Sequence, residues 1–257
     1  MMIHPREYTL AGPEHAPAIV LIHGARMTRA LWQPQIDALG ASLRVIAPDL
    51  PGHGALAHVP FSLDAAVSQI ATVIDTVADG RAIVCGLSLG GYVALAFGAR
   101  HPQRTTALVL SGCTFAFHGL PGRLIGAPYV AVTRFATRTF SPLLARAEER
   151  TLRKTYPAAL AEPIIARGFF YRFYADISAA LLDFDPLPAL RACDMPVLLL
   201  NGANDRFFRR DEHSYLRALR QGRLRLIENA SHLANLDQPE AYTTALRDFV
   251  SEVVAVQ

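Results

Sequence analysis

The sequence is short of cysteine and lysine, and each shortage excludes a class of protein. Its three cysteines, Cys85, Cys113 and Cys193, lie far apart, so they predict buried free thiols and not a disulfide framework or a metal site. Lys154 is the only lysine, and the net charge of +3 comes from arginines interspersed with acidic residues. That pattern is typical of solvated surfaces and argues against a nucleic-acid-binding stripe.

Long apolar runs, internal repeats and low-complexity linkers are also missing. No apolar segment approaches the length of a membrane span, and residues 1–12 lack the apolar centre of a secretory signal. We therefore expect a cytoplasmic protein without membrane insertion. The composition, 51% hydrophobic and 18% charged over 257 residues, is typical of a globular chain with room for one α/β domain and an insertion.

What the sequence does contain is an alternation of short apolar runs and helical patterns. A leading edge strand is predicted at 7–10, and buried strands at 18–22, 43–47, 82–85, 107–110, 196–200 and 224–227. Helices are predicted at about 28–39, 62–77, 90–100, 211–220 and from 239 onward. Repeated strand-helix units predict a mostly parallel, doubly wound sheet whose reactive groups gather at the carboxyl ends of the strands.

The alternation stops between residues 114 and 188, where the pattern predicts helices near 129–138, 142–154, 163–173 and 178–182 and no strand. Over half of the aromatic residues lie here, which favours a helical lid over a pocket at the strand ends. We predict a core domain of residues 1–113 and 189–257 and a lid domain of residues 114–188. Candidate pocket walls, each with core packing as the alternative, are Phe117, His118, Tyr129, Phe135 and Phe170.

The stretch 82–91 predicts a strand, a sharp turn and a helix, with Ser88 in the turn. Residues 86–90 match G-x-S-x-G, in which the glycines leave room for a serine held in a strained conformation. The strain exposes the hydroxyl, and the N–H of Leu89 at the helix N-terminus favours a developing negative charge. Alone the motif is moderately specific, because an ordinary strand-helix turn can contain the same residues.

Two residues downstream complete a possible triad with Ser88. Asp205 follows the strand at 196–200 and His232 follows the strand at 224–227, so all three residues lie at the same edge of the sheet. Neutral His232 would accept the serine proton, and Asp205 would orient the imidazole and stabilise its charged form. The N–H of Ala25, just after the first core strand, is expected to complete an oxyanion hole with that of Leu89.

Other residues compete for these roles. His213 falls inside a predicted helix, Asp194 precedes its strand, and Asp211 is explained by a helix cap.

The loops after the first two core strands contain four more polar residues of interest. His23, His53 and Asp49 are interpreted as residues that order these loops. Arg26 is either a surface residue or a cation that attracts an acidic substrate.

Five motifs in order resemble the α/β-hydrolase superfamily, at residues 22–24, 49–54, 86–91, 201–205 and 231–233. More narrowly, the chain resembles the bacterial carboxylesterase and enol-lactonase branch, over residues 18–249 apart from the lid. The resemblance implies the triad Ser88, Asp205 and His232 with the donors Ala25 and Leu89. Serine at the turn argues against haloalkane dehalogenases and epoxide hydrolases, which need a carboxylate nucleophile. Residues 25–27 and 233 differ from the pattern of carbon-carbon hydrolases of ring-cleavage products.

The resulting prediction is a serine hydrolase without metal or cofactor. Its substrate would be a small-molecule carboxylic ester with a small to medium apolar acyl or aryl group, cleaved through an acyl-enzyme. The same triad leaves lactone, thioester and diketone carbon-carbon hydrolysis open, and a receptor that binds without turnover is the alternative from another class. Monomer and homodimer both stay open.

Overall fold

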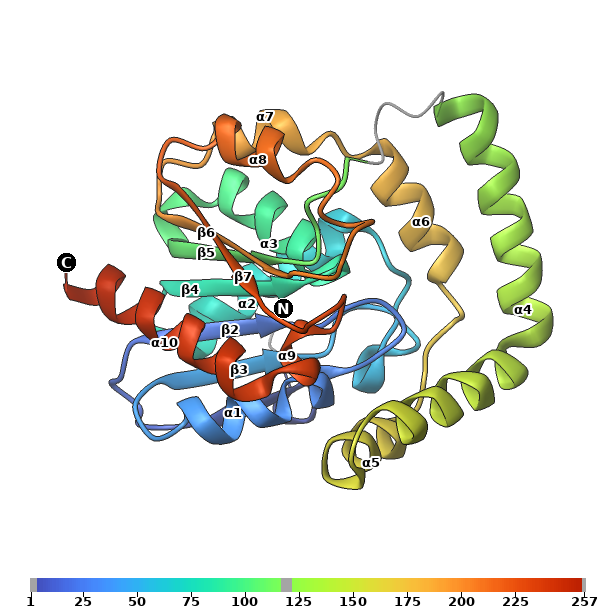
Figure 1. Ribbon diagram of the computed structural model, residues 1–257, viewed down its shortest axis with the longest axis horizontal. Coiled ribbons are helices and arrows are strands. Elements are labelled where there is room, and N and C mark those ends of the chain that lie inside the picture. The colour runs from blue at the N-terminus through green and yellow to red at the C-terminus, as the bar shows by residue number, and fades with distance from the viewer. Residues whose placement is uncertain (1–3, 117–121, 256–257) are drawn as a thin grey trace.

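The computed structural model of the protein describes residues 4–116 and 122–255 (Figure 1). Within this part of the chain, seven strands form one sheet in the order β1-β3-β2-β4-β5-β6-β7. All neighbours are parallel except β1, which pairs antiparallel with β3 at one edge. The strand bounds are β1 Tyr8–Ala11, β2 Ala18–Ile22, β3 Arg44–Pro48, β4 Ala82–Leu87, β5 Thr105–Ser111, β6 Val197–Gly202 and β7 Gly222–Ile227. The predicted fold class and the leading edge strand are confirmed.

Side-chain alternation along the central strands produces a hydrophobic core on each face of the sheet. In β2, Ile19 and Leu21 belong to one buried cluster while Val20 and Ile22 belong to the other. Because helices cover both faces, central strands can be continuously apolar, as the sequence pattern indicates. The edge strand β7 alternates instead, with Arg223 and Arg225 exposed.

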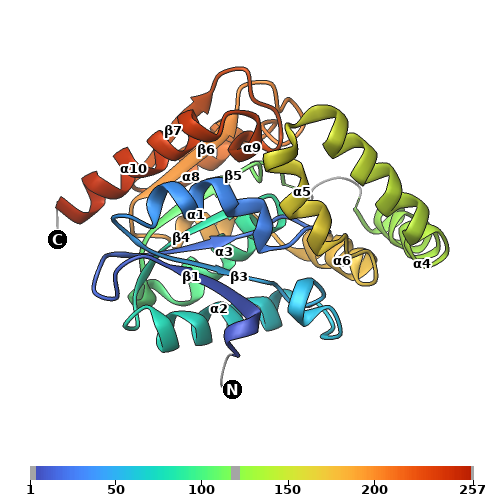
Figure 2. The same cartoon turned by 90° about the horizontal axis from the view of Figure 1, so that it is seen from below.

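Helices from both ends of the chain form the two outer layers (Figure 2). Residues of α1 (Gln33–Leu39) and α10 (Pro239–Ala255) belong to one cluster, and those of α2 (Leu63–Val77) and α3 (Leu89–Arg100) to the other. The short helices α8 (Glu212–Ala218) and α9 (Ala234–Asp237) flank β7 along the chain. The predicted helix cap at Ser62 is confirmed, because its hydroxyl accepts the N–H of Ala65.

Between β5 and β6 the chain is helical, as predicted. This segment contains α4 (Gly122–Thr155), α5 (Ala158–Arg167), α6 (Tyr174–Asp183) and α7 (Pro186–Arg191). In Figure 1 the arrowheads of β2 and β3 point toward the side of the molecule where α4 and α6 lie. The insertion therefore lies at the carboxyl edge of the sheet. Its division from the core as a separate domain stays a prediction.

Two helix boundaries predicted within this insertion are wrong. The helices predicted at 129–138 and 142–154 are parts of one helix, α4, which continues through Pro128 and Pro142. Proline has no N–H to donate to the carbonyl four residues earlier in the helix. Because Pro142 is exposed, that carbonyl can accept from water instead. The helix predicted at 163–173 is α5, which begins at Ala158 and ends before Gly168, a glycine at φ 78°.

Two further sequence predictions concern the three cysteines and membrane-spanning helices. Cys85, Cys113 and Cys193 are buried and free, as the wide spacing indicated. Of the helices in the described residues, none combines the length and apolarity needed to cross a bilayer.

Candidate active site

Ser88 occupies a one-residue turn between β4 and α3. Its φ of 56° and ψ of −118° lie in a region that costs a residue with a side chain roughly 1–3 kcal/mol. The turn is held by the N–H of Ser88, which donates to the carbonyl of Ser111 at 2.8 Å, and by the N–H of Gly91, which donates to the carbonyl of Ser88 at 2.9 Å. The strained turn predicted from G-x-S-x-G is therefore confirmed.

The glycines beside Ser88 are required by close backbone packing. A Cβ atom at Gly86 would collide with the carbonyl oxygen of Gly90, and one at Gly90 would collide with the carbonyl oxygen of Ile22 at the end of β2. The start of α3 is thereby packed directly against the end of β2. This contact brings the loop that contains Ala25 close to Ser88.

The structure brings Ser88, His232 and Asp205 into one hydrogen-bonded chain. His232 Nε2 lies 3.0 Å from Ser88 Oγ, and His232 Nδ1 lies 2.7 Å from Asp205 Oδ2. Asp205 is 6% exposed, so its carboxylate is shielded from water. The carboxylate fixes the proton of neutral His232 on Nδ1 and leaves the lone pair of Nε2 for the serine hydroxyl. This arrangement can deprotonate Ser88.

Two residues that the sequence analysis missed hold the imidazole from its sides. The ring of Phe208 stacks on that of His232 with centroids 4.1 Å apart and planes at 25°. Gly112, at φ 56°, faces the ring, because a Cβ there would lie 3.1 Å from its Cε1 and Nδ1 atoms. Phe208 lies three residues after Asp205 in the same loop, which is the only signal that the sequence contains for it.

A buried polar network that the sequence analysis also missed joins the loops after β5 and β6. Asn201 is fully buried, and its side chain accepts from the N–H of Gly112 at 2.9 Å. It also donates to Glu212 at 2.8 Å and to Thr114 at 3.0 Å. Because Gly112 faces His232, this network extends to the ring that contacts Ser88.

The N–H groups of Ala25 and Leu89 are the expected oxyanion donors. Ala25 lies in the turn after β2, and Leu89 is the first residue of α3. Within the described part of the chain, neither N–H donates to a protein acceptor. A Cβ at the neighbouring Gly24 would lie only 3.5 Å from the Cβ of Ser88, so this turn passes close to the serine. The oxyanion role of both groups stays a prediction.

His23 lies in the interior, and backbone groups occupy both of its ring nitrogens. Its Nε2 accepts from the N–H of Leu50 at 2.9 Å, and its Nδ1 donates to the carbonyl of Gly24 at 2.8 Å. Burial lowers the pKa of His23 to about 4, so the ring is neutral at pH 7. The residue connects the loops after β2 and β3.

His53 and Asp49 order the loop after β3 in a similar way. His53 Nε2 accepts from the N–H of Arg26 at 3.0 Å, and burial lowers the pKa of His53 to about 3. Asp49 pairs with the guanidinium of Arg29 and accepts from the N–H groups of Arg29 and Ala55, each at 3.0 Å. These contacts fit the loop-ordering interpretation.

The competing residues lie away from Ser88 or have other partners. His213 is exposed on α8, and Asp194 forms an exposed ion pair with Arg220 at 2.5 Å. Asp211 occupies the N-cap position of α8, as predicted, but its side chain makes no capping hydrogen bond. Its carboxylate accepts from the N–H of Ala116 at 2.9 Å instead.

The candidate pocket walls in the insertion are scattered. Phe117 and His118 lie outside the described residues. Tyr129 and Phe135 are 51% and 66% exposed on α4. Phe170 contacts the ring of His53, with centroids 6.2 Å apart, and lines a hollow of about 720 Å³ between α4 and the segment 169–173. Phe170 thus contacts a histidine that bonds the backbone next to Ala25. Substrate contact stays a prediction for all five candidates.

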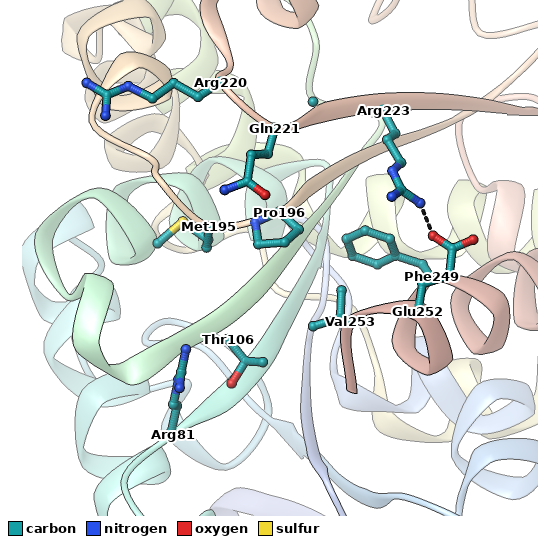
Figure 3. A pocket seen from close by; sticks show the side chains of 11 residues that line it. Arg81, Thr106, Met195, Pro196, Arg220, Gln221, Arg223, Phe249, Glu252 and Val253 are labelled. Carbon is teal, nitrogen blue, oxygen red and sulfur yellow. Dashed lines mark hydrogen bonds and ion pairs between the residues drawn. The ribbon is translucent and has the colours of Figure 1, made fainter. Parts of the chain in front are cut away.

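A second hollow, of about 490 Å³, lies near the amino ends of strands β4 to β7, opposite the end that contains Ser88 (Figure 3). Arg81 and Thr106, near the beginnings of β4 and β5, line it together with Phe249 of α10 and the ion pair of Arg223 and Glu252. Its lining includes none of the predicted site residues. In residues 4–116 and 122–255, no group of three or more histidine, cysteine or carboxylate side chains is placed to hold a metal ion.

A doubly wound sheet with a serine in a strained strand-helix turn and a histidine and a carboxylate on later loops defines a class of hydrolases. The chain belongs to the alpha/beta hydrolase family, which matches residues 19–245. The resemblance predicted from the five motifs is thereby confirmed.

Curated relatives and solved structures agree with the narrower branch. A pimeloyl-[acyl-carrier protein] methyl ester esterase of Neisseria meningitidis is 32% identical over 94% of this chain and 96% of that protein. The 3-oxoadipate enol-lactonase 1 of Acinetobacter baylyi is 26% identical over 94% and 91%. The enol-lactonase of Burkholderia xenovorans superposes with a TM-score of 0.77 at 25% identity, over 95% of each chain. A thermophilic esterase of Thermogutta terrifontis superposes with a TM-score of 0.80 at 25% identity, over 96% and 93%.

Proposed function

We propose that the protein is a carboxylesterase that cleaves small-molecule esters through an acyl-enzyme formed on Ser88. The observation that carries the proposal is the continuous hydrogen-bonded chain from Asp205 through His232 to Ser88. A histidine between a buried carboxylate and a strained serine has the geometry of general-base activation. The relatives named as an ester esterase and an enol-lactonase support the same chemistry.

The reaction proceeds in two halves. Ser88 Oγ bonds to the ester carbonyl carbon while its proton passes to His232 Nε2, and the oxyanion accepts from the N–H groups of Ala25 and Leu89. Cleavage of the carbon-oxygen bond releases the alcohol, which takes the proton from His232. Water then gives a proton to His232, attacks the acyl-enzyme and releases the carboxylic acid, and the proton returns to Ser88. Asp205 stabilises the imidazolium in both halves.

Aromatic rings beside the base support an apolar acyl or aryl substrate. From His232 outward, the ring of Phe208 is followed by that of Phe207 at 5.1 Å, and Phe207 by Phe115 at 4.6 Å. Phe207 is more than half exposed although it is a large apolar residue, so its ring is available to contact a ligand. We infer that these rings form one apolar wall of the acyl or alcohol site.

The first test replaces the nucleophile. Ser88→Ala is expected to lower kcat on a chromogenic short-chain ester by roughly a thousandfold or more, because the acyl-enzyme cannot form. Ser68→Ala, on the exposed face of α2, is the matched control and should leave kcat unchanged. Circular dichroism verifies that both variants fold. Turnover of Ser88→Ala close to that of the wild type would contradict the proposal.

A lactone is the second candidate substrate, favoured by the enol-lactonase relatives. Rates on matched ester, lactone, thioester and diketone substrates rank the candidate bonds. A receptor function would instead give ligand-dependent thermal stabilisation with negligible turnover.

A further inference from the structure

Two polar pairs connect α4, or the residue just after it, to residues outside the helical insertion, and each pair includes or reaches a direct neighbour of a proposed catalytic group. Glu148 accepts from Arg26 Nη1 at 2.9 Å, and Arg26 follows the oxyanion residue Ala25. Tyr156, just after α4, donates to Asp237 Oδ1 at 2.6 Å. The other oxygen of Asp237 accepts from the N–H of Ser231 at 2.6 Å, and Ser231 precedes His232.

We propose that Glu148 and Tyr156 are positioning residues through which α4 sets the oxyanion turn and the loop of the base. The inference rests on the proposed function, because it assigns what these contacts do for Ala25 and His232.

Arg26 is the residue through which Glu148 would act on the turn. Its φ of 69° is strained, and its backbone is held on both sides. Its N–H donates to His53 at 3.0 Å and its carbonyl accepts from the N–H of Phe170 at 2.8 Å. With the side chain bound to Glu148 as well, the turn depends on both the core and the insertion. A shift of α4 would therefore move the peptide next to the Ala25 donor.

The partners of Arg26 argue against its use as a receptor for an acidic substrate. Glu148, which is 12% exposed, neutralises the guanidinium and also accepts from the hydroxyl of Tyr171. The rings of Tyr171 and Tyr174 lie 5.9 and 5.6 Å from the guanidinium carbon, a cation-π arrangement. The charge of Arg26 is thus already balanced, which favours a positioning role.

Asp237 connects Tyr156 to the loop that contains His232, because its two carboxylate oxygens accept from Tyr156 and from the N–H of Ser231. Burial raises the pKa of Tyr156 above its ordinary range, so its hydroxyl stays a donor at neutral pH. Two other ion pairs of the insertion, among the residues that the structure describes, join helices within it: Arg153 binds Glu162 at 2.9 Å, and Arg134 binds Asp176 at 2.9 Å. These two ion pairs provide matched controls, because they also involve α4 but do not contact the loops that contain Ala25 and His232.

The test compares Glu148→Ala and Tyr156→Phe with the control Glu162→Ala on a neutral chromogenic ester. We expect kcat to fall roughly tenfold in each of the two variants with KM within about twofold, since small misplacements of reacting groups lower the rate steeply. Glu148→Gln, which keeps an oxygen acceptor for Arg26 and Tyr171, should recover part of the loss. Glu162→Ala should match the wild type. Unchanged kcat in both variants, or a rise in KM with kcat unchanged, would overturn the inference.

A second measurement does not need turnover. Hydrogen exchange of the amides at 24–27 should accelerate in Glu148→Ala, and that at 230–233 in Tyr156→Phe, relative to Glu162→Ala. Equal exchange in all three proteins would refute the positioning role even where the esterase assignment stands. Absence of ester turnover in the wild type would instead refute the proposed function.

The choice of substrate separates positioning from recognition. We expect the Glu148→Ala loss in kcat to be the same on the neutral ester and on a half-ester of a dicarboxylic acid. A kcat unchanged on the neutral ester and altered only on the anionic half-ester would mean that the Arg26–Glu148 pair acts on the charge of the substrate, and would overturn the inference. Tyr156→Phe removes one oxygen atom and keeps the apolar contacts, so it tests the inference even where Glu148→Ala fails to fold.

Discussion

Replacing Asp205 by asparagine tests the role of its carboxylate without changing the shape of the site. The carboxylate lies 2.7 Å from His232 Nδ1 and is 6% exposed, so water cannot substitute for it. If the amide nitrogen faces Nδ1, the imidazole proton moves to Nε2, which faces Ser88 at 3.0 Å and then has no lone pair for the serine proton. If the amide oxygen faces Nδ1, the tautomer is kept and the charge that stabilises the imidazolium is lost.

Either orientation removes transition-state stabilisation. The corresponding change in a serine protease triad lowers kcat by about 10⁴, equivalent to roughly 5 kcal/mol at 1.36 kcal/mol per tenfold. We expect a similar loss here in steady-state hydrolysis of a chromogenic ester, with the melting temperature within a few degrees of the wild type. Asp211→Asn is the matched control, because this carboxylate accepts a hydrogen bond from the backbone N–H of Ala116 and does not contact Ser88 or His232 through any hydrogen bond of the described residues. A loss below tenfold for Asp205→Asn would refute the assigned role.

Two further predictions concern stability. His23 and His53 have pKa values lowered to about 4 and 3, so the unfolded chain binds more protons below pH 6.5, and the free energy of unfolding should fall by roughly 2 kcal/mol for each histidine between pH 7 and pH 5. Urea unfolding at both pH values measures this fall in the free energy of unfolding. In His53→Gln the fall between pH 7 and pH 5 should be smaller, and a fall as large as that of the wild type would contradict the prediction. Asn201→Ala should lower the free energy of unfolding by roughly 2–4 kcal/mol in the same assay, because it leaves the buried Glu212 and the N–H of Gly112 without this partner. A loss below 0.5 kcal/mol would show that the network is dispensable.

The position of the base illustrates how distant segments combine. Strands β6 and β7 place Asp205 and His232 on neighbouring loops, and the N–H of Asn204 donates to the carbonyl of Ala230 at 2.8 Å to hold these loops together. Phe208 and Gly112 then confine the ring from the loops after β6 and β5. The alignment of Nε2 with Ser88 is therefore a product of three loops.

The sequence alone determined the features that depend on local sterics and periodicity. Apolar runs separated by helical patterns predicted the parallel sheet, and the glycines around Ser88 predicted the strained turn. Because parallel strands place their carboxyl ends at one edge, the order Ser88, Asp205, His232 was enough to predict that these residues meet.

Only the tertiary structure decided the contacts between residues far apart in the chain. Arg26 and Glu148 are separated by 122 positions, and no periodicity relates them. Helix α4 continues through Pro142, which is exposed so that water can replace the missing hydrogen bond, and local propensity cannot reveal this exposure. Phe208 stacks on His232 because of the way its loop folds. Such contacts depend on the shape and burial that distant segments create together, so the chain order predicts that Ser88, Asp205 and His232 meet but does not predict the residues that hold them in place.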